Sequence, residues 1–233
     1  MVGGKQPILA SVIPILNEEK HIASCLNSLI NQSLDSSKHI IMILDGGSTD
    51  NTIQIVNSYI EKSKEANGPE IILLDNPSRY VAEARNIALK ELPSSISLMI
   101  ELIGHCTIPE NHLEKRLEVW NDLTKNSNQK IAALGVKVLP SSESKNMVET
   151  WIESALSSKL GSGSGQFDNF AGTSTTKVPA FCMHSRKAID SVGGWDSEFI
   201  TSQDSDLSMR LIKEGFELYR TDQTCVNMVK RSS

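Results

Sequence analysis

The residues best placed to do chemistry begin with the carboxylate of Asp45, which directly follows the apolar residues 40–44. Two glycines and the polar run 48–52 come next, and an amphipathic stretch begins at Ile53. This pattern predicts a buried parallel strand, a turn and a capped helix. Open α/β sheets bind ligands outside the carboxyl ends of their strands, so Asp45 could accept hydrogen bonds from a ligand there. The alternative is an ordinary strand–turn–helix junction.

A second polar junction follows the apolar residues 10–16, where Asn17 and Glu18 precede a helical pattern that starts at Ile22. The chain therefore opens with strand, helix, strand and helix. Polar residues thus stand at the end of each of the first two strands, where open α/β sheets bind ligands.

The two junctions, VIPILNEE and ILDGGSTDNT, resemble the start of glycosyltransferase family 2, whose members use nucleotide sugars and have the GT-A fold. Gly47 stands where serine is commoner in that family. The resemblance implies an α/β fold with a Rossmann-like, mostly parallel central sheet in a single GT-A domain over residues 1–233. Its nucleotide-binding half would span about residues 8–106 and its acceptor half about residues 107–220. The implied donor contacts include Pro14, Asn17, Glu18 and Asp45.

A third stretch, RYVAEARNIAL, resembles the family's G-x-x-x-A-R-N helix. The resemblance implies that Arg85 lies near the nucleotide. A guanidinium offers a rigid fork of donors that suits a phosphate or a uracil edge. The alternative is an arginine on the surface of a helix.

The stretch IELIGHCTIP lies where the family keeps its DXD motif, which binds the donor diphosphate, usually through Mg²⁺ or Mn²⁺. Gly104 and His105 match the succinoglycan-type variant D-G-H-C, but Ile103 replaces its leading aspartate. The resemblance implies a diphosphate beside Gly104 and His105, with His105 as the metal ligand and weaker dependence on a divalent ion. Glu101 could supply the missing carboxylate. Alternatively, Glu101 forms a buried ion pair and His105 only caps the next turn.

Residues 193–199 and 203–211 resemble the family pattern G-G-F-D-E-x-F…E-D-x-D-L-x-x-R-L, with Gln203 in place of the glutamate. The resemblance implies that Asp204 is the general base, which takes the proton of the acceptor hydroxyl in a single inverting displacement. A helix N-terminus would help to keep this carboxylate ionised. The alternative is that Asp204 is a helix cap. We expect Asp206 to cap the helix or to pair with Arg210.

Composition limits the possible partners and surroundings. The 233 residues carry a formal net charge of −5 with no basic stripe, which argues against nucleic acid as a partner. The four cysteines are widely spaced, which favours reduced thiols over a zinc site or disulfides. We see no signal peptide and no membrane-crossing apolar run. We therefore expect a cytoplasmic protein, with peripheral association at the inner face of the membrane if the chain is a piece of a longer protein.

The sequence therefore predicts an inverting glycosyltransferase that moves a sugar from a nucleotide sugar to a saccharide or lipid-linked acceptor, in exopolysaccharide or glycoconjugate biosynthesis. The substitutions at Ile103 and Gln203 leave open a catalytically weak or silent nucleotide-sugar-binding regulatory protein. A dinucleotide-dependent oxidoreductase is disfavoured because no GxGxxG turn follows the first strand.

The remaining pattern predicts further elements around these motifs. The expected strands are residues 71–74, 96–103, 131–139, 179–185 and 216–220, and the expected helices are residues 80–91, 109–123, 146–160, 186–192 and 207–214. We expect residues 61–70 to be a polar linker. The glycine-rich residues 161–165 predict either a loop over the acceptor or a plain linker.

Overall fold

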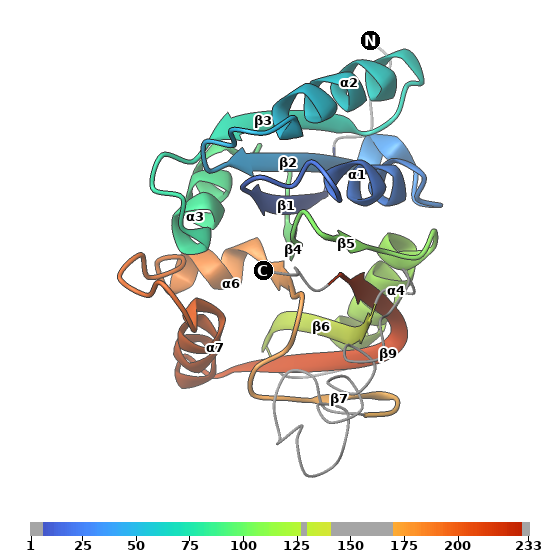
Figure 1. Ribbon diagram of the computed structural model, residues 1–233. Coiled ribbons are helices and arrows are strands. Elements are labelled where there is room, and N and C mark those ends of the chain that lie inside the picture. The colour runs from blue at the N-terminus through green and yellow to red at the C-terminus, as the bar shows by residue number, and fades with distance from the viewer. Residues whose placement is uncertain (1–6, 127–129, 141–169, 230–233) are drawn as a thin grey trace, which may run out of the picture.

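A computed structural model describes residues 7–126, 130–140 and 170–229, and one sheet runs through all three segments (Figure 1). Its order is β3-β2-β1-β4-β8-β6-β9-β5, and β7 pairs with β9. The strands are β1 (Leu9–Ile15), β2 (His39–Asp45), β3 (Glu70–Asp75), β4 (Leu98–Glu101), β5 (Cys106–Thr107), β6 (Lys130–Pro140), β7 (Thr173–Thr175), β8 (Met183–Ser185) and β9 (Phe216–Met228).

The block β3-β2-β1-β4 is parallel throughout. Ile15 is in register with Asp45, and Asp45 with Asp75, so the carboxyl ends of these strands lie at one edge. Beyond β4 the sheet is mixed, because β8 runs antiparallel to both β4 and β6 while β6 and β9 are parallel. The loops that follow the strands of the parallel block therefore lie next to one another at this edge.

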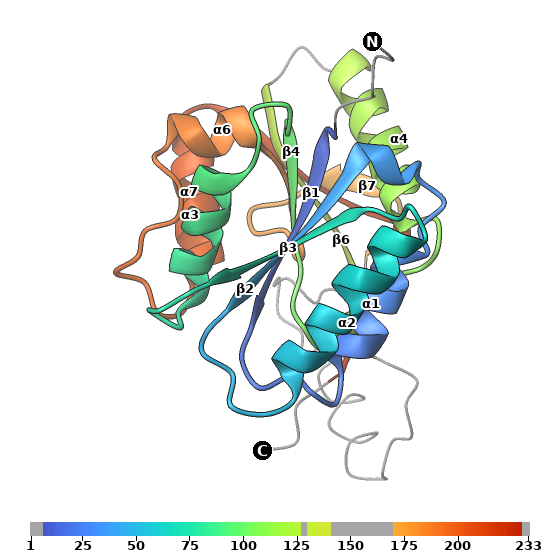
Figure 2. The same cartoon turned by 90° about the horizontal axis from the view of Figure 1, so that it is seen from above.

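Helices cover both faces of the sheet (Figure 2). One face carries α1 (Ile22–Ile30), α2 (Thr52–Glu65) and α4 (His112–Asn126); the other carries α3 (Val81–Glu91), α6 (Arg186–Ser191) and α7 (Gln203–Lys213). A short 3₁₀ turn, η1 (Ser36–Lys38), leads into β2. Each helical layer encloses its own apolar core against the sheet.

The central strands are buried on both faces, which explains their continuous apolar runs. In β1, Leu9 and Ile13 contribute to the core under α1, α2 and α4, whereas Ala10 and Val12 contribute to the core under α3, α6 and α7. Successive side chains of a strand point to opposite faces, so such a strand needs apolar residues at nearly every position.

The structure corrects several predicted boundaries. Helix α2 continues to Glu65 through part of the expected linker, because Ser63 is buried there and donates to the carbonyl of Pro69 at 2.7 Å. Strand β8 begins only at Met183, since Phe181 has φ 46° and breaks the extended backbone. Helix α4 begins at His112 rather than at residue 109, and β9 runs on to residue 228.

Two predicted elements, the helix at residues 146–160 and the glycine-rich loop at residues 161–165, lie outside the described residues. Helix α7 begins at Gln203 rather than at residue 207, so Asp204 lies within it. The other predicted strands and helices are present with shifts of a few residues at their ends.

Candidate active site

Asp45 ends β2, and its carboxylate closes the loop that follows. Its side chain accepts from the backbone N–H of Gly47 at 3.0 Å, from that of Ser48 at 3.1 Å, and from the Ser48 hydroxyl at 2.6 Å. Gly47 has φ 83°, a left-handed conformation that glycine adopts without strain. Asp45 is 8% exposed, so a buried carboxylate organises the loop that follows β2.

Asn17 joins the loop after β1 to the loop after β2. Its backbone N–H donates to the Ser48 hydroxyl at 2.9 Å, and its Oδ1 accepts from the backbone N–H of Thr49 at 2.8 Å. Asn17 has φ 54°, and asparagine is one of the residues that tolerate this left-handed region. The structure thus brings Asn17 and Asp45 together through Ser48. Pro14 lies at the end of β1, in register with Leu44.

Glu18 links the same edge to the loop after β4. Its Oε1 lies 2.8 Å from Nδ1 of His105, and its backbone N–H donates to Thr52 Oγ1 at 2.7 Å. A Cβ at Gly104 would lie only 2.7 Å from Cγ of Glu18, so this close approach requires glycine at position 104. The side chain of His105 therefore contacts Glu18, which differs from the alternative in which it only caps a turn.

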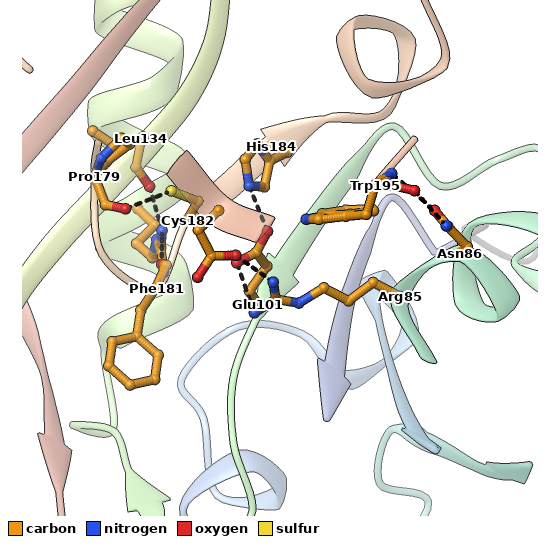
Figure 3. Close-up of polar contacts among 11 residues, drawn as sticks. Arg85, Asn86, Glu101, Leu134, Pro179, Phe181, Cys182, His184 and Trp195 are labelled. Carbon is orange, nitrogen blue, oxygen red and sulfur yellow. Dashed lines mark hydrogen bonds and ion pairs between the residues drawn. The ribbon is translucent and has the colours of Figure 1, made fainter. Parts of the chain in front are cut away.

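A second group of charges links the helices α3 and α7 to the strands β4 and β8. The guanidinium of Arg85 forms an ion pair with Asp204. It forms a second ion pair, at 3.0 Å, with Oε2 of Glu101 (Figure 3). The other oxygen, Oε1 of Glu101, accepts from Nε2 of His184 at 2.7 Å. Arg85 is 5% exposed, so it is not a surface arginine.

Trp195 covers this group of charges. Its ring lies 5.7 Å from the guanidinium of Arg85 and meets the ring of His184 edge to face at 5.8 Å. Asn86 fixes the Trp195 backbone: Asn86 Nδ2 donates to the Trp195 carbonyl at 2.7 Å, and the Trp195 N–H donates to Asn86 Oδ1 at 2.9 Å (Figure 3). Arg85 and Asn86 are neighbours in α3, so this helix supplies both the shared cation and the side chain that fixes Trp195.

Asp204 lies in the first turn of α7 and keeps contact with solvent. Its side chain is 33% exposed, although Arg85, with which it pairs, is buried. Burial and the negative charge of Glu101 raise the pKa of Asp204, against the opposing effect of Arg85. The pKa of Glu101 is lowered, because Arg85 and His184 outweigh the effect of burial. Asp206 pairs with Arg210 at 2.7 Å, which is one of the two arrangements expected from the sequence.

The predicted site residues thus fall into two groups. Asn17, Glu18, Asp45, Gly104 and His105 gather around the loops of the parallel block, whereas Arg85 lies with Asp204. Sequence reasoning gave no role to His184 or Trp195. Trp195 lies in the matched run 193–199, at the place of the motif's first phenylalanine, and His184 lies within an apolar stretch that ordinary core packing explains equally well.

The residues present do not fit a metal site well. Both oxygens of Glu101 are engaged by Arg85 and His184, so Glu101 does not replace the missing aspartate of the DXD motif. Among the described residues, no group of three or more His, Cys, Asp or Glu side chains could hold a metal ion. Glu18 and His105 offer one carboxylate and one imidazole, which is a poor set for Mg²⁺.

The sheet order, the two helical layers and the loops at the carboxyl edge define a GT-A fold. The chain belongs to glycosyl transferase family 2, because the sequence model of that family matches residues 11–193. The predicted resemblance to this family is therefore confirmed.

Curated relatives extend beyond this chain. Succinoglycan biosynthesis protein ExoA of Rhizobium meliloti (strain 1021) is 29% identical over 213 residues, which cover 91% of this chain and 60% of that protein. A dolichyl N-acetyl-alpha-D-glucosaminyl phosphate 3-beta-D-2,3-diacetamido-2,3-dideoxy-beta-D-glucuronosyltransferase of Methanococcus voltae is 29% identical over 226 residues, covering 97% of this chain and 68% of that protein.

Solved structures share the fold at low sequence identity. S. aureus TarS 1–349 in complex with UDP-GlcNAc has a TM-score of 0.71 at 17% identity, covering 97% of this chain and 59% of that one. Mannosyltransferase PcManGT from Pyrobaculum calidifontis, in complex with GDP-Man and Mn²⁺, has a TM-score of 0.65 at 16% identity, covering 97% and 57%. These likenesses confirm the predicted fold class.

Within residues 7–126, 130–140 and 170–229, none of the helices has the length and apolar character needed to span a bilayer.

Proposed function

We propose that this chain is an inverting glycosyltransferase that moves a sugar from a nucleotide-sugar donor to a saccharide or lipid-linked acceptor. Membership of glycosyl transferase family 2 supports this assignment. The names of the relatives, which include a succinoglycan biosynthesis protein and a transferase acting on a dolichyl-linked saccharide, favour polysaccharide or glycoconjugate biosynthesis. The four cysteines are free, which fits the reducing cytoplasm.

The donor would bind at the loops of the parallel block. Pro14, Asn17, Glu18 and Asp45 lie at or beside the carboxyl ends of β1 and β2, where open α/β sheets bind ligands. The Asp45 carboxylate would accept the imide or amide N–H of the base, and the diphosphate would lie near Gly104. Arg85, which the family resemblance assigns to the nucleotide, would contribute from the site of its ion pair with Asp204.

The observation that carries the proposal is the position of Asp204. It is a carboxylate at a helix N-terminus, one third exposed, with Oδ1 fixed by a buried arginine. Its second oxygen, Oδ2, is the atom that would take the proton. An acidic group whose pKa is raised towards neutrality is a better base than an ordinary aspartate.

The reaction would be one displacement at the anomeric carbon. The acceptor oxygen forms the new bond to that carbon as the bond to the diphosphate oxygen breaks, and the electron pair leaves with the nucleoside diphosphate. The hydroxyl proton passes to Oδ2 of Asp204. Because the acceptor attacks from the face opposite the leaving group, the anomeric configuration inverts. We assign no step to a metal ion, because the described residues do not fit one.

Asp204→Asn tests this proposal directly. The variant keeps the shape of the side chain but removes the base, so the transfer rate should fall by about 10²–10⁴-fold. The rate is measured as release of UDP or GDP from UDP-GlcNAc or GDP-mannose with free and lipid-linked saccharides as acceptors. Donor affinity, measured by calorimetry, should hold.

Asp206→Asn is the matched control, since Asp206 lies on the same helix and pairs with Arg210. It should transfer at nearly the wild-type rate. An Asp204→Asn variant that equals the wild type would refute the assignment, and one that loses stability and donor binding together would make Asp204 a structural cap.

The second candidate is a catalytically silent nucleotide-sugar-binding protein. It is favoured by Ile103 in the DXD position and by Gln203 beside the proposed base. This candidate predicts that UDP or GDP raises the melting temperature while no nucleotide is released from the sugar donors, with or without Mn²⁺. Release above the Asp204→Asn background would exclude it.

A further inference from the structure

Glu101 is a buried carboxylate that the proposed reaction does not use. It ends β4, is 4% exposed, and has both oxygens engaged: Oε2 with Arg85 and Oε1 with His184. A buried charge of this kind persists only with partners that satisfy it. Glu101 is connected to Asp204 through Arg85, which forms an ion pair with each of them.

Arg85 divides its guanidinium between two acids. Nη2 pairs with Glu101 at 3.0 Å, while Nη1 pairs with Asp204. One positive charge thus serves two carboxylates in a site covered by Trp195. With Glu101 present, Asp204 receives only part of the stabilisation that an unshared arginine would give its ionised form.

The charged and titratable groups that face this site come from several elements. Arg85 belongs to α3, Glu101 to β4 and His184 to β8, and the thiol of Cys182 and the cation Arg116 of α4 also act on Glu101 or Asp204. Arg116 donates to the carbonyls of Leu134 and Phe181. Burial raises the pKa of Asp204, and Glu101 is the negative charge that raises it further by opposing ionisation of Asp204.

We propose that Glu101 is a positioning residue that sets the basicity of Asp204 through their shared arginine and orients that arginine by its bond to His184. This inference rests on the proposed function for its catalytic meaning. The coupling of Glu101 to Asp204 through Arg85 can be measured without any transfer reaction.

The test is Glu101→Gln. The amide oxygen can still accept from Arg85, and the amide N–H₂ can donate to Nε2 of His184 in the other tautomer of the imidazole. Asp204 should then titrate lower by about one pH unit, because Arg85 is no longer shared with a second negative charge. The titration is followed by ¹³C NMR of the aspartate carboxyls, with the Asp204 signal assigned from its absence in Asp204→Asn.

Activity gives a second measurement. The acidic limb of the pH profile for kcat should move down with the Asp204 titration, and kcat at pH 7 should fall several-fold because a weaker base accepts the proton less well. The KM for the donor should stay unchanged. Glu118→Gln removes an exposed carboxylate paired with Lys115 and should change neither measurement.

The outcomes separate the two proposals. An unchanged Asp204 titration in a folded Glu101→Gln variant overturns the inference, whatever the activity. A wild type that releases no nucleotide at any pH refutes the proposed function, and the NMR titration still decides the coupling. If Glu101→Gln does not fold, the wild-type protein decides: the Asp204 signal must show a second inflection at the lower pH at which Glu101 titrates, and an Asp204 signal with a single inflection overturns the inference.

Discussion

Two carboxylates at the proposed site, Asp45 on the donor side and Asp204 on the acceptor side, are held in different ways. Asp45 is held by backbone N–H groups and by a serine within three residues of it in the sequence. Asp204 is held by an arginine 119 positions away, which in turn holds Glu101 and through it His184. One acid is held by its own loop and the other by a network of side chains from several elements.

The difference has an energetic consequence. Neutral N–H and O–H donors satisfy a carboxylate without adding charge, so losing one of them costs about the value of a single hydrogen bond, roughly 0.5–1.5 kcal/mol, or somewhat more for an ionised partner. A buried ion pair leaves an uncompensated charge when one partner is removed, at a cost of about 3–5 kcal/mol. The acceptor side should therefore fail as a unit, and the donor side should weaken gradually.

The largest effect should come from Arg85→Met. It removes the cation that two acids share, so the free energy of unfolding should fall by about 3–5 kcal/mol in urea denaturation. Lys115→Met is the matched control, because its pair with Glu118 is exposed and should contribute too little to resolve. Adding Glu101→Gln to Arg85→Met should recover part of the loss, since it removes the unpaired charge. A double variant that is less stable than Arg85→Met would contradict the network account.

A smaller effect is expected on the donor side from Asp45→Ala. Removal of a charge-assisted hydrogen bond to the base should weaken binding of UDP or GDP by about 1.5–3 kcal/mol in calorimetry. Asp45→Asn separates the ligand contact from the loop. Its amide oxygen can still accept from Gly47 and Ser48, but it no longer offers two acceptor oxygens. Wild-type affinity in a stable Asp45→Asn variant would show that the carboxylate only closes its loop.

The same contrast explains what the sequence could predict. Asp45, Asn17 and Glu18 were predictable because strand, turn and cap lie side by side in the chain and the edge of a parallel sheet brings them together. The motif at residues 203–211 predicted a role for Asp204. It did not predict the ion pair with Arg85, because the Arg85 motif carries no information about a contact 119 residues away.

Glu101 shows most clearly what the sequence alone could not predict. The sequence allowed two roles, metal ligand and buried ion pair, and only the fold decides between them by bringing Arg85 and His184 to its two oxygens. His184 lies in a three-residue strand of the mixed part of the sheet. Neither a hydrophobic periodicity nor a turn motif there indicates that its side chain contacts Glu101. The extent of α2 was missed for a related reason, since the burial of Ser63 depends on the loop that packs against it.

The smallest effect that tests the contrast is the pH dependence of stability for one acid from each side. Asp50, in the donor-side loop, has a lowered pKa: burial alone would raise it, but the hydrogen bonds from Thr52 and from the N–H of Glu19 together outweigh burial. Asp204 has a raised pKa. A carboxyl with a lowered folded pKa contributes stability that is present above its unfolded pKa and lost as the pH falls. One with a raised folded pKa contributes stability that is lost as the pH rises through the interval from its unfolded to its folded value.

The measurement is the difference in unfolding free energy between wild type and each Asp→Asn variant, followed in urea from pH 3.5 upward to neutrality, about the range in which aspartates titrate. The advantage of the wild type over Asp50→Asn should grow as the pH rises. Its advantage over Asp204→Asn should shrink over the same range, because burial and the charge of Glu101 oppose ionisation of Asp204 in the folded protein. Comparing slopes rather than absolute values removes the cost of changing each side chain. If both differences change with the same sign, the acids share one kind of environment, and the division into a loop-held donor side and a charge-coupled acceptor side would have to be abandoned.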